Sequence, residues 1–204
     1  MNIPIGMENG ESHSIAQAIQ KTYPDFYIGA TLFRGDLSVH IKKAGILFVA
    51  QFLRDDPALD FDYPIHISSV DDMVSSSTAR GRNQTTFEDR FEMVYELFSI
   101  RKKHQVRIKT RVSERDCTID SVTAIWKGAN YQEREVYDMM GIKFNNHPEL
   151  KRILLPDEYT EGYPLRKNFP VEGRGWRDTF EFLDQDGTPS ADGTATADGT
   201  PSAK

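Results

Sequence analysis

Apolar and polar positions along the first third of the chain predict a mixture of helices and strands. Residues 14–22 repeat apolar side chains at helical spacing, and residues 44–53 form a second, almost wholly apolar helix. Residues 26–41 alternate apolar and polar side chains around a turn at 34–36, which is the pattern of a β-hairpin. A further strand is expected to begin at Tyr63.

Two longer strands are predicted next, after a polar loop at residues 75–86. Residues 91–100 are apolar on both faces, which places that strand in the middle of a sheet. Residues 106–112 are apolar on one face and basic on the other. Helices and strands therefore alternate without a regular β-α-β order. We expect an α+β fold, a two-layer domain with a mixed β-sheet covered by helices, over residues 12–142 after a flexible N-terminus at 1–11.

The basic face of the strand at 106–112 allows two interpretations. Arg107, Lys109 and Arg111 stand at alternate positions, so they form either an ordinary solvated face or a contact with an acidic partner surface. Nucleic-acid binding is not expected, because aromatic residues are not interleaved with these cations and the net charge is -6.

A third helix, predicted to begin near Asn130, carries an unusual group of charges. Asn130 and Glu133 have the spacing of a capping box, and Gly141 is suited to end the helix in a left-handed conformation. Apolar residues gather on one side of this helix. The charged residues of the opposite side are Arg134, Glu135 and Asp138.

These charges allow three interpretations. Arg134 and Asp138 are four residues apart and can pair, but one arginine cannot fully neutralise both Asp138 and Glu135. The group is then a solvated face, or a cation on another chain completes it, or the two carboxylates perform acid–base catalysis. Catalysis is the weakest of these, because no nucleophile, metal set or phosphate-binding loop lies nearby in the sequence.

The C-terminal quarter predicts an arm and a tail. Residues 143–183 show no sustained helical or strand period and contain four prolines, yet they are rich in aromatic residues. We expect an extended arm whose aromatic rings are buried against another protein. Residues 184–204 carry a hexapeptide of the DGTPSA type three times, without large apolar side chains, and predict a disordered tail.

Candidate ligands for cofactors and metals are few. Cys117 is the single cysteine, whereas an iron–sulfur cluster usually takes four thiolates, and the five histidines are not spaced as a zinc site. Neither nucleotide-binding glycine motif occurs, and no apolar run approaches the roughly 20 residues of a membrane span. We therefore expect a cytoplasmic chain with no catalytic, cofactor-binding or metal-binding residues of its own.

Several spaced motifs in the second half of the chain carry a resemblance to a known family. They are SVTAIW at 121–126, EREVYDMMGI at 133–142, HPEL at 147–150, RIL at 152–154 and GYPLRKNFP at 162–170. In this order they resemble the C subunit of the bacterial proton-pumping NADH–quinone oxidoreductase, respiratory complex I. Before these motifs, only the order of strands and helices agrees.

The resemblance implies a structural subunit of the peripheral arm that docks on subunits D and B. It would support electron transfer from NADH through FMN and iron–sulfur centres to quinone, coupled to proton translocation, with every cofactor carried by other subunits. The isolated chain would be non-catalytic, and the complex would hold it on the cytoplasmic side of the inner membrane. The residues assigned to the partner interface are Glu133, Arg134, Glu135, Asp138, Arg166 and Lys167, the last two as anchors of the arm.

Two positions depart from the family pattern, and two alternative functions stay open. Tyr131 stands in place of the usual Trp and keeps an aromatic ring, whereas Asn168 stands in place of the usual Asp and removes a charge. Membrane-bound nickel–iron hydrogenases and plastoquinone-linked dehydrogenases carry similar chains. A stand-alone acid–base enzyme using Glu135 and Asp138 is an alternative of another class.

Overall fold

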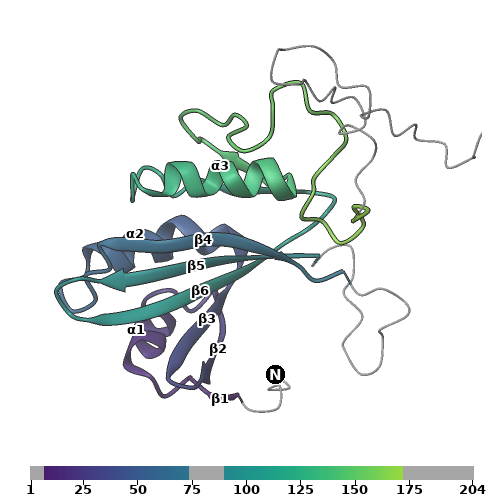
Figure 1. The fold of residues 1–204 in the computed structure, drawn as a ribbon. Helices are drawn as coiled ribbons and strands as arrows, with labels where there is room; N and C mark the ends of the chain where they lie inside the picture. Colours follow the sequence, from purple (N-terminus) through teal and green to yellow (C-terminus); the bar gives the residue numbers. More distant parts are fainter. Residues whose placement is uncertain (1–6, 74–89, 172–204) are drawn as a thin grey trace, which may run out of the picture.

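The computed structural model of the chain describes residues 7–73 and 90–171, and its main element is a six-stranded sheet (Figure 1). The strand order is β1-β2-β3-β6-β5-β4. The strands are β1 Glu8–Asn9, β2 Tyr27–Phe33, β3 Asp36–Ile41, β4 Tyr63–Asp71, β5 Phe91–Ser99 and β6 His104–Val112. β3 and β6 run parallel and the other neighbours antiparallel, so the sheet is mixed, as predicted.

The helices of the described residues pack against this sheet through one apolar core. They are α1 Ser14–Thr22, α2 Ile46–Asp55, which follows a short 3-10 turn at Lys43–Gly45, and α3 Ala129–Met140. The core cluster takes residues from all three helices and from strands β2 to β6. Figure 1 shows α3 on the β4 side of the sheet. The predicted α+β fold, with a mixed sheet covered by helices, is confirmed.

The hairpin and the central strand follow directly from the sequence pattern. Arg34 and Gly35 have φ of 54° and 91°, so a two-residue turn with both residues left-handed joins β2 to β3. β5 lies between β4 and β6, as expected for the strand that is apolar on both faces. Its Met93, Tyr95 and Leu97 are at most 1% exposed.

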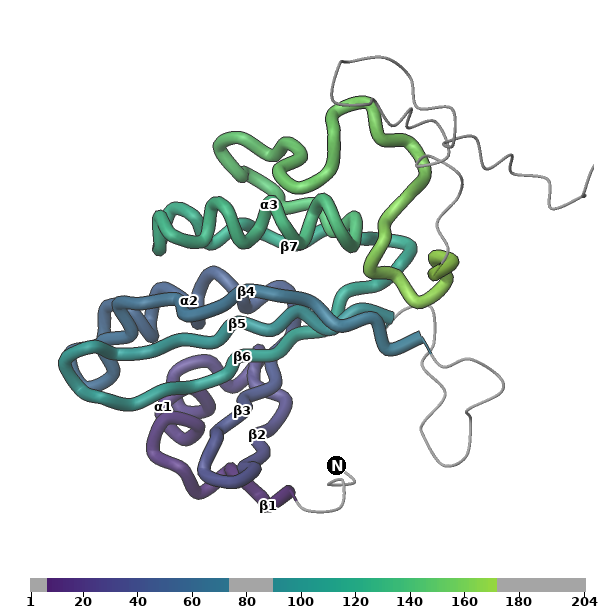
Figure 2. Tube along the Cα trace, viewed as in Figure 1, coloured from purple at the N-terminus to yellow at the C-terminus, as the bar shows by residue number. Residues whose placement is uncertain are grey.

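A small second unit follows the main sheet. β7 (Thr118–Asp120) and β8 (Lys143–Asn145) pair in parallel on either side of α3 in the sequence. The folded body therefore continues beyond residue 142, where the domain was predicted to end. The following residues, 146–171, contain neither helix nor strand, and Figure 2 shows them passing over α3 and then running to the ends of β4 and β5.

Several predicted segments lie partly or wholly outside the described residues. These are the polar loop at 75–86, the arm beyond residue 171 and the repeat tail at 184–204. The predicted flexible N-terminus at 1–11 contains β1, whose Glu8–Asn9 pair with β2.

Candidate functional site

Glu133 of α3 points into the chain, and its side chain is 0% exposed. One carboxylate oxygen accepts a hydrogen bond from Ser121 Oγ at 2.6 Å, and the other accepts one from the Val122 N–H at 2.7 Å. The capping box predicted for Asn130 and Glu133 is therefore wrong, since α3 begins at Ala129 and its N-cap residue is Gly128, which provides no side-chain cap. Burial raises the pKa of Glu133 to about 7, although both hydrogen bonds favour the ionised form.

Arg134 is covered by the segment that follows β8. It is 8% exposed, and its guanidinium donates to the carbonyl oxygens of Lys151 at 3.1 Å and Arg152 at 3.0 Å. The guanidinium also lies over the ring of Tyr131, 5.6 Å from its centroid. Arg134 thus binds the main chain of the arm instead of forming the predicted pair with Asp138.

Asp138 is 0% exposed and holds the same segment through its carboxylate. Arg152 Nη1 donates to it at 2.6 Å, and the N–H groups of Ile153, Leu154 and Leu155 donate at 3.1, 2.9 and 2.9 Å. Burial alone would raise the pKa of Asp138, but these four donors outweigh burial and lower it. Of the three interpretations of this cluster, a cation on another chain is not required for Asp138, because Arg152 of the same chain pairs with it. We call this arrangement the Asp138 anchor.

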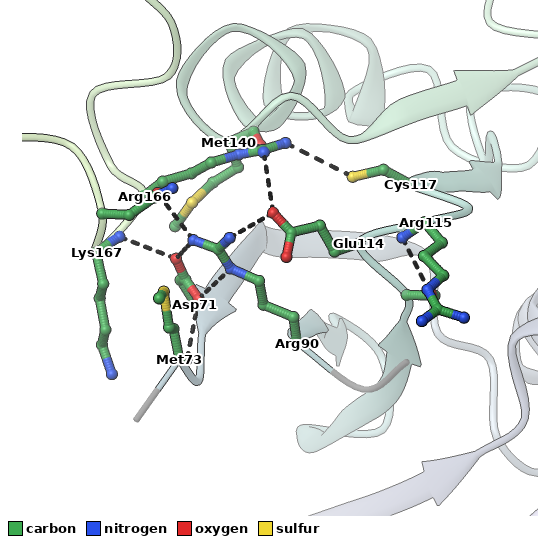
Figure 3. Close-up of polar contacts among 11 residues, drawn as sticks. Asp71, Met73, Arg90, Glu114, Arg115, Cys117, Met140, Arg166 and Lys167 are labelled. Carbon is green, nitrogen blue, oxygen red and sulfur yellow. Dashed lines mark hydrogen bonds and ion pairs between the residues drawn. The ribbon is translucent and has the colours of Figure 1, made fainter. Parts of the chain in front are cut away.

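A second buried carboxylate, Asp71 at the end of β4, binds the arm further along (Figure 3). Arg90 donates to its two oxygens, at 3.0 Å from Nε and 2.6 Å from Nη2, and the Lys167 N–H donates at 2.9 Å. Arg90 also donates to Glu114 at 2.5 Å and to Asn168 Oδ1 at 3.0 Å. The Met73 N–H donates to the same carboxylate at 3.0 Å. Burial alone would raise the pKa of Asp71, but Arg90 and the N–H groups of Lys167 and Met73 lower it. We call this arrangement the Asp71 anchor.

Arg166 lies between the two anchors, on the aromatic surface at the end of α3. Its guanidinium is 4.9 Å from the ring centroid of Phe91 and 4.5 Å from that of Tyr163, and its Nε donates to the Met140 carbonyl at 2.7 Å. Gly141 ends α3 with φ of 75°, as predicted, and a Cβ there would lie 2.4 Å from the Tyr163 ring. Arg166 therefore holds the arm on its own chain.

Glu135 and Lys167 are the two predicted interface residues whose side chains face solvent. The other four residues, Glu133, Arg134, Asp138 and Arg166, bind groups of the chain itself through the contacts above. A direct partner contact thus stays a prediction for Glu135 and Lys167.

The basic face of β6 is matched by carboxylates of its own sheet. Arg107 pairs with Glu96 at 2.8 Å, Lys109 with Glu92 at 2.8 Å, and Arg111 with Glu92 at 3.2 Å. Arg111 also pairs with Asp72, so three carboxylates face the three cations. This arrangement fits a solvated face of paired charges and gives no surplus of positive charge for an acidic partner.

The aromatic residues of the described arm pack on the chain itself. Phe144 is 3% exposed in the core, and Tyr159 is 7% exposed beneath Arg152. The expectation that these rings need another protein for burial is therefore wrong for them. Trp176, Phe180 and Phe182 lie outside the described residues.

Groups suited to metal binding or to spanning a membrane do not occur among the described residues. Within residues 7–73 and 90–171, no group of three or more His, Cys, Asp or Glu side chains could hold a metal ion. Cys117 is partly buried, and burial raises the pKa of its thiol. In the same two ranges, no helix has the length and apolar character needed to cross a bilayer.

Comparison with known proteins assigns this architecture to a family. The family described as respiratory-chain NADH dehydrogenase, 30 Kd subunit, matches residues 39–175, which is more than half of the chain. The chain belongs to this 30 kDa subunit family. The predicted resemblance is confirmed, and the chain is a subunit of a complex I-type assembly, NADH–quinone oxidoreductase.

Members of the 30 kDa subunit family resemble the chain over most of its length. The NADH-quinone oxidoreductase C subunit of Roseiflexus castenholzii is 43% identical over 161 residues, which cover 79% of this chain and 85% of the relative. The protein of the same name from Citrifermentans bemidjiense is 37% identical over 163 residues, which cover 80% of this chain and 92% of the relative.

Solved structures agree with the 30 kDa subunit fold. The trypsin-resistant fragment (1-134) of Nqo5 superposes with a TM-score of 0.51 at 25% identity, covering 66% of this chain and 97% of the fragment. A chain of the membrane-bound sulfane sulfur reductase, an archaeal respiratory membrane complex, superposes with a TM-score of 0.62 at 18% identity, covering 88% of this chain and 99% of that chain. The second likeness is one of fold alone.

Sequence reasoning missed four of the residues that organise this family member. Asp71 at the end of β4, Arg90 just before β5 and Glu114 just after β6 come together from separate parts of the chain, so no local spacing could have paired them. Arg152 lies within one of the family motifs, but its partner Asp138 had been placed on the exposed face of α3. The available signal was the i, i+3 step from Glu135 to Asp138, which indicated a missing cation without saying where it lies.

Proposed function

We propose that this chain is a non-catalytic scaffold, the C subunit of NADH–quinone oxidoreductase, that docks on subunits D and B in the peripheral arm. The observation that carries the proposal is the 43% identity with the NADH-quinone oxidoreductase C subunit of Roseiflexus castenholzii, over 85% of that relative. In this role the chain supports electron transfer from NADH to quinone, coupled to proton translocation, without taking part in the chemistry.

The use of the charged groups supports a structural role. Glu133, Asp138 and Asp71 are the buried carboxylates most suited to chemistry, and each accepts hydrogen bonds from at least two groups of the chain. A general acid or base must reach a substrate proton, whereas these three are turned toward loops that they hold.

The cofactors and the location belong to the same proposal. FMN, the iron–sulfur centres and quinone are held by other subunits, and this chain reaches the membrane indirectly, on its cytoplasmic side. The side chains proposed to meet neighbouring subunits are those of Glu135, exposed on α3, and of Lys167, exposed on the arm where its N–H donates to Asp71.

Isolation of the complex tests the proposal. The tagged chain is extracted from membranes in mild detergent, its partners are identified by mass spectrometry, and the preparation is examined for flavin and iron–sulfur absorption and for NADH–quinone reductase activity. We expect subunits D and B among the partners, activity in the complex and none in the chain alone. Turnover by the purified chain alone would refute the scaffold role.

A related complex is the alternative that the same preparation distinguishes. The fold is shared with a chain of an archaeal respiratory membrane complex, and equivalent subunits of nickel–iron hydrogenases or plastoquinone-linked dehydrogenases would have this architecture too. Electron-input subunits of a hydrogenase, in place of NADH-binding subunits, would favour that alternative.

A further inference from the structure

The segment at residues 151–169 lacks the ladder hydrogen bonds of a helix or strand, yet buried carboxylates of the body bind its backbone. The N–H groups of Ile153, Leu154 and Leu155 donate to Asp138, and that of Lys167 donates to Asp71. Three consecutive N–H groups can reach one carboxylate only in a narrow range of backbone conformations, so the contact specifies the local path of the chain.

Asp138 in turn depends on this segment for its partners, whereas Asp71 keeps Arg90 and the Met73 N–H from the body and takes the Lys167 N–H from the arm. Asp138 is 0% exposed and Asp71 is 3% exposed, and a buried carboxylate is costly unless it is both paired and hydrogen-bonded. The Arg152 cation and the three N–H groups that bind Asp138 all belong to the arm. If the arm detached, Asp138 would lose these partners together, so the body itself favours the bound arm.

A third set of contacts fixes the stretch between the anchors. Arg166 lies against the Phe91 and Tyr163 rings, and the Leu165 N–H donates to the Met139 carbonyl at 3.2 Å. These contacts hold the arm at the C-terminal end of α3, where Gly141 leaves room for Tyr163.

We propose that residues 151–169 are folded onto the body before any partner subunit binds. The Asp138 and Asp71 anchors together hold them there, and we call this pair of anchors the latch. The arm then meets its partner with Leu154 and Leu165 displayed on a fixed backbone, 56% and 57% exposed. A pre-ordered arm loses less conformational entropy on assembly than one that folds on contact. The inference concerns the chain alone, so it stands or fails independently of the proposed function.

Hydrogen exchange of the isolated full-length chain tests the latch. Amides of residues 153–155 and of Lys167 are expected to exchange at least about tenfold more slowly than in an unstructured peptide, because each must open before it exchanges. Exchange of these amides at the unstructured rate, while β5 stays protected, would overturn the proposal.

Single substitutions separate the two anchors. Asp138→Asn is expected to speed exchange of the amides at 153–155 by about tenfold and to affect the Lys167 amide less. Asp71→Asn is expected to speed exchange of the Lys167 amide by about tenfold and to affect the amides at 153–155 less. Glu149→Gln is the matched control, because it removes an exposed carboxylate of the same region that pairs with Lys151. Equal acceleration in the control and in Asp138→Asn, or none in either anchor variant, contradicts the latch.

If Asp138→Asn does not fold, Arg152→Gln replaces it as the variant that weakens the Asp138 anchor. The Arg152 side chain is 22% exposed, and its substitution leaves the carboxylate and its three backbone donors in place. Exchange at 153–155 is again expected to accelerate relative to Lys167, and an unchanged pattern counts against the Asp138 anchor.

Discussion

Buried carboxylates in this chain differ in the hydrogen-bond donors that surround them, and these donors determine whether the pKa of each is raised or lowered. Asp138 and Asp71 each bind an arginine and at least one backbone N–H, so the pKa of each is lowered despite burial. Glu133 binds one hydroxyl and one N–H, which do not outweigh burial, and its pKa rises to about 7. Among the described residues, burial thus brings the pKa of the Glu133 carboxyl close to neutral pH.

The first prediction follows from the sign of the Glu133 shift. Its folded pKa of about 7 exceeds the ordinary 4.5, so its stabilising contribution is complete below about pH 4.5 and is lost as the pH rises through about 7. Between these limits the free energy of unfolding should fall by up to about 3 kcal/mol on account of this group. Glu133→Gln, which cannot ionise, should lack this fall, and denaturant unfolding at about pH 5 and about pH 8 measures it.

His147 provides the internal check on this titration. Its Nε2 lies 3.9 Å from the Glu133 carboxylate, and burial lowers its pKa, so its own contribution to stability grows with pH, opposite in sign to that of Glu133. Since His147 is present in both proteins but lies beside Glu133, the difference between the wild type and Glu133→Gln reports the titration of the glutamate together with its coupling to His147. The same pH dependence in both proteins would show that Glu133 does not titrate in this range.

At the residue scale, the sequence predicted backbone requirements better than side-chain partners. Gly141 was expected to end α3 and does so with φ of 75°, because a left-handed terminator is a local property of the chain. Glu133 was assigned to a capping box from spacing alone, whereas Ser121 and Val122 bind it from another segment. Such partners depend on tertiary packing, which local spacing does not contain.

Helices and strands were predictable where the spacing of their apolar residues indicates which face is buried. α1, the β2–β3 hairpin and the central position of β5 all follow from that period. The parallel neighbours β3 and β6 are far apart in the sequence, and β7 and β8 have three residues each, so their pairing leaves little periodic signal. The partners of charged side chains from different elements were the least predictable, since an arginine can lie on a solvent-exposed face or within a buried cluster.

The second prediction contrasts two arginines that the sequence alone does not distinguish. The side chains of the Arg90–Asp71 pair are 5% and 1% exposed, whereas those of the Arg107–Glu96 pair are 30% and 27% exposed. Arg90→Ala leaves a buried carboxylate without its cation and should lower the free energy of unfolding by about 3–5 kcal/mol. Arg107→Ala should lower it by about 1 kcal/mol or less. Denaturant unfolding measures both changes, and similar costs would mean that the Asp71 anchor is not a buried ion pair in solution.

The whole molecule combines a sheet domain that the sequence largely predicts with an arm that it describes only in part. The aromatic, proline-containing arm was expected to be sheltered by another protein, because no period connects it to the domain. Its described portion instead binds the domain through Asp138, Asp71 and Arg166. The side chains that point away from these contacts, among them the exposed side chain of Lys167, are the ones that the proposed function assigns to a partner.

The third prediction tests that surface in the assembled complex. The Lys167 N–H is held by Asp71 while its side chain is exposed, so Lys167→Glu reverses a charge without removing a side-chain donor from the anchor. If this cation faces a neighbouring subunit, the variant should recover about tenfold less of the partner subunits in a mild-detergent pull-down, because a misplaced charge at an interface costs binding free energy. Lys102→Glu, which reverses another exposed charge at the β5–β6 turn, is the matched control and should assemble normally. Both isolated variants should unfold at the wild-type denaturant concentration, and equal recovery of partners by both would place the interface elsewhere on the chain.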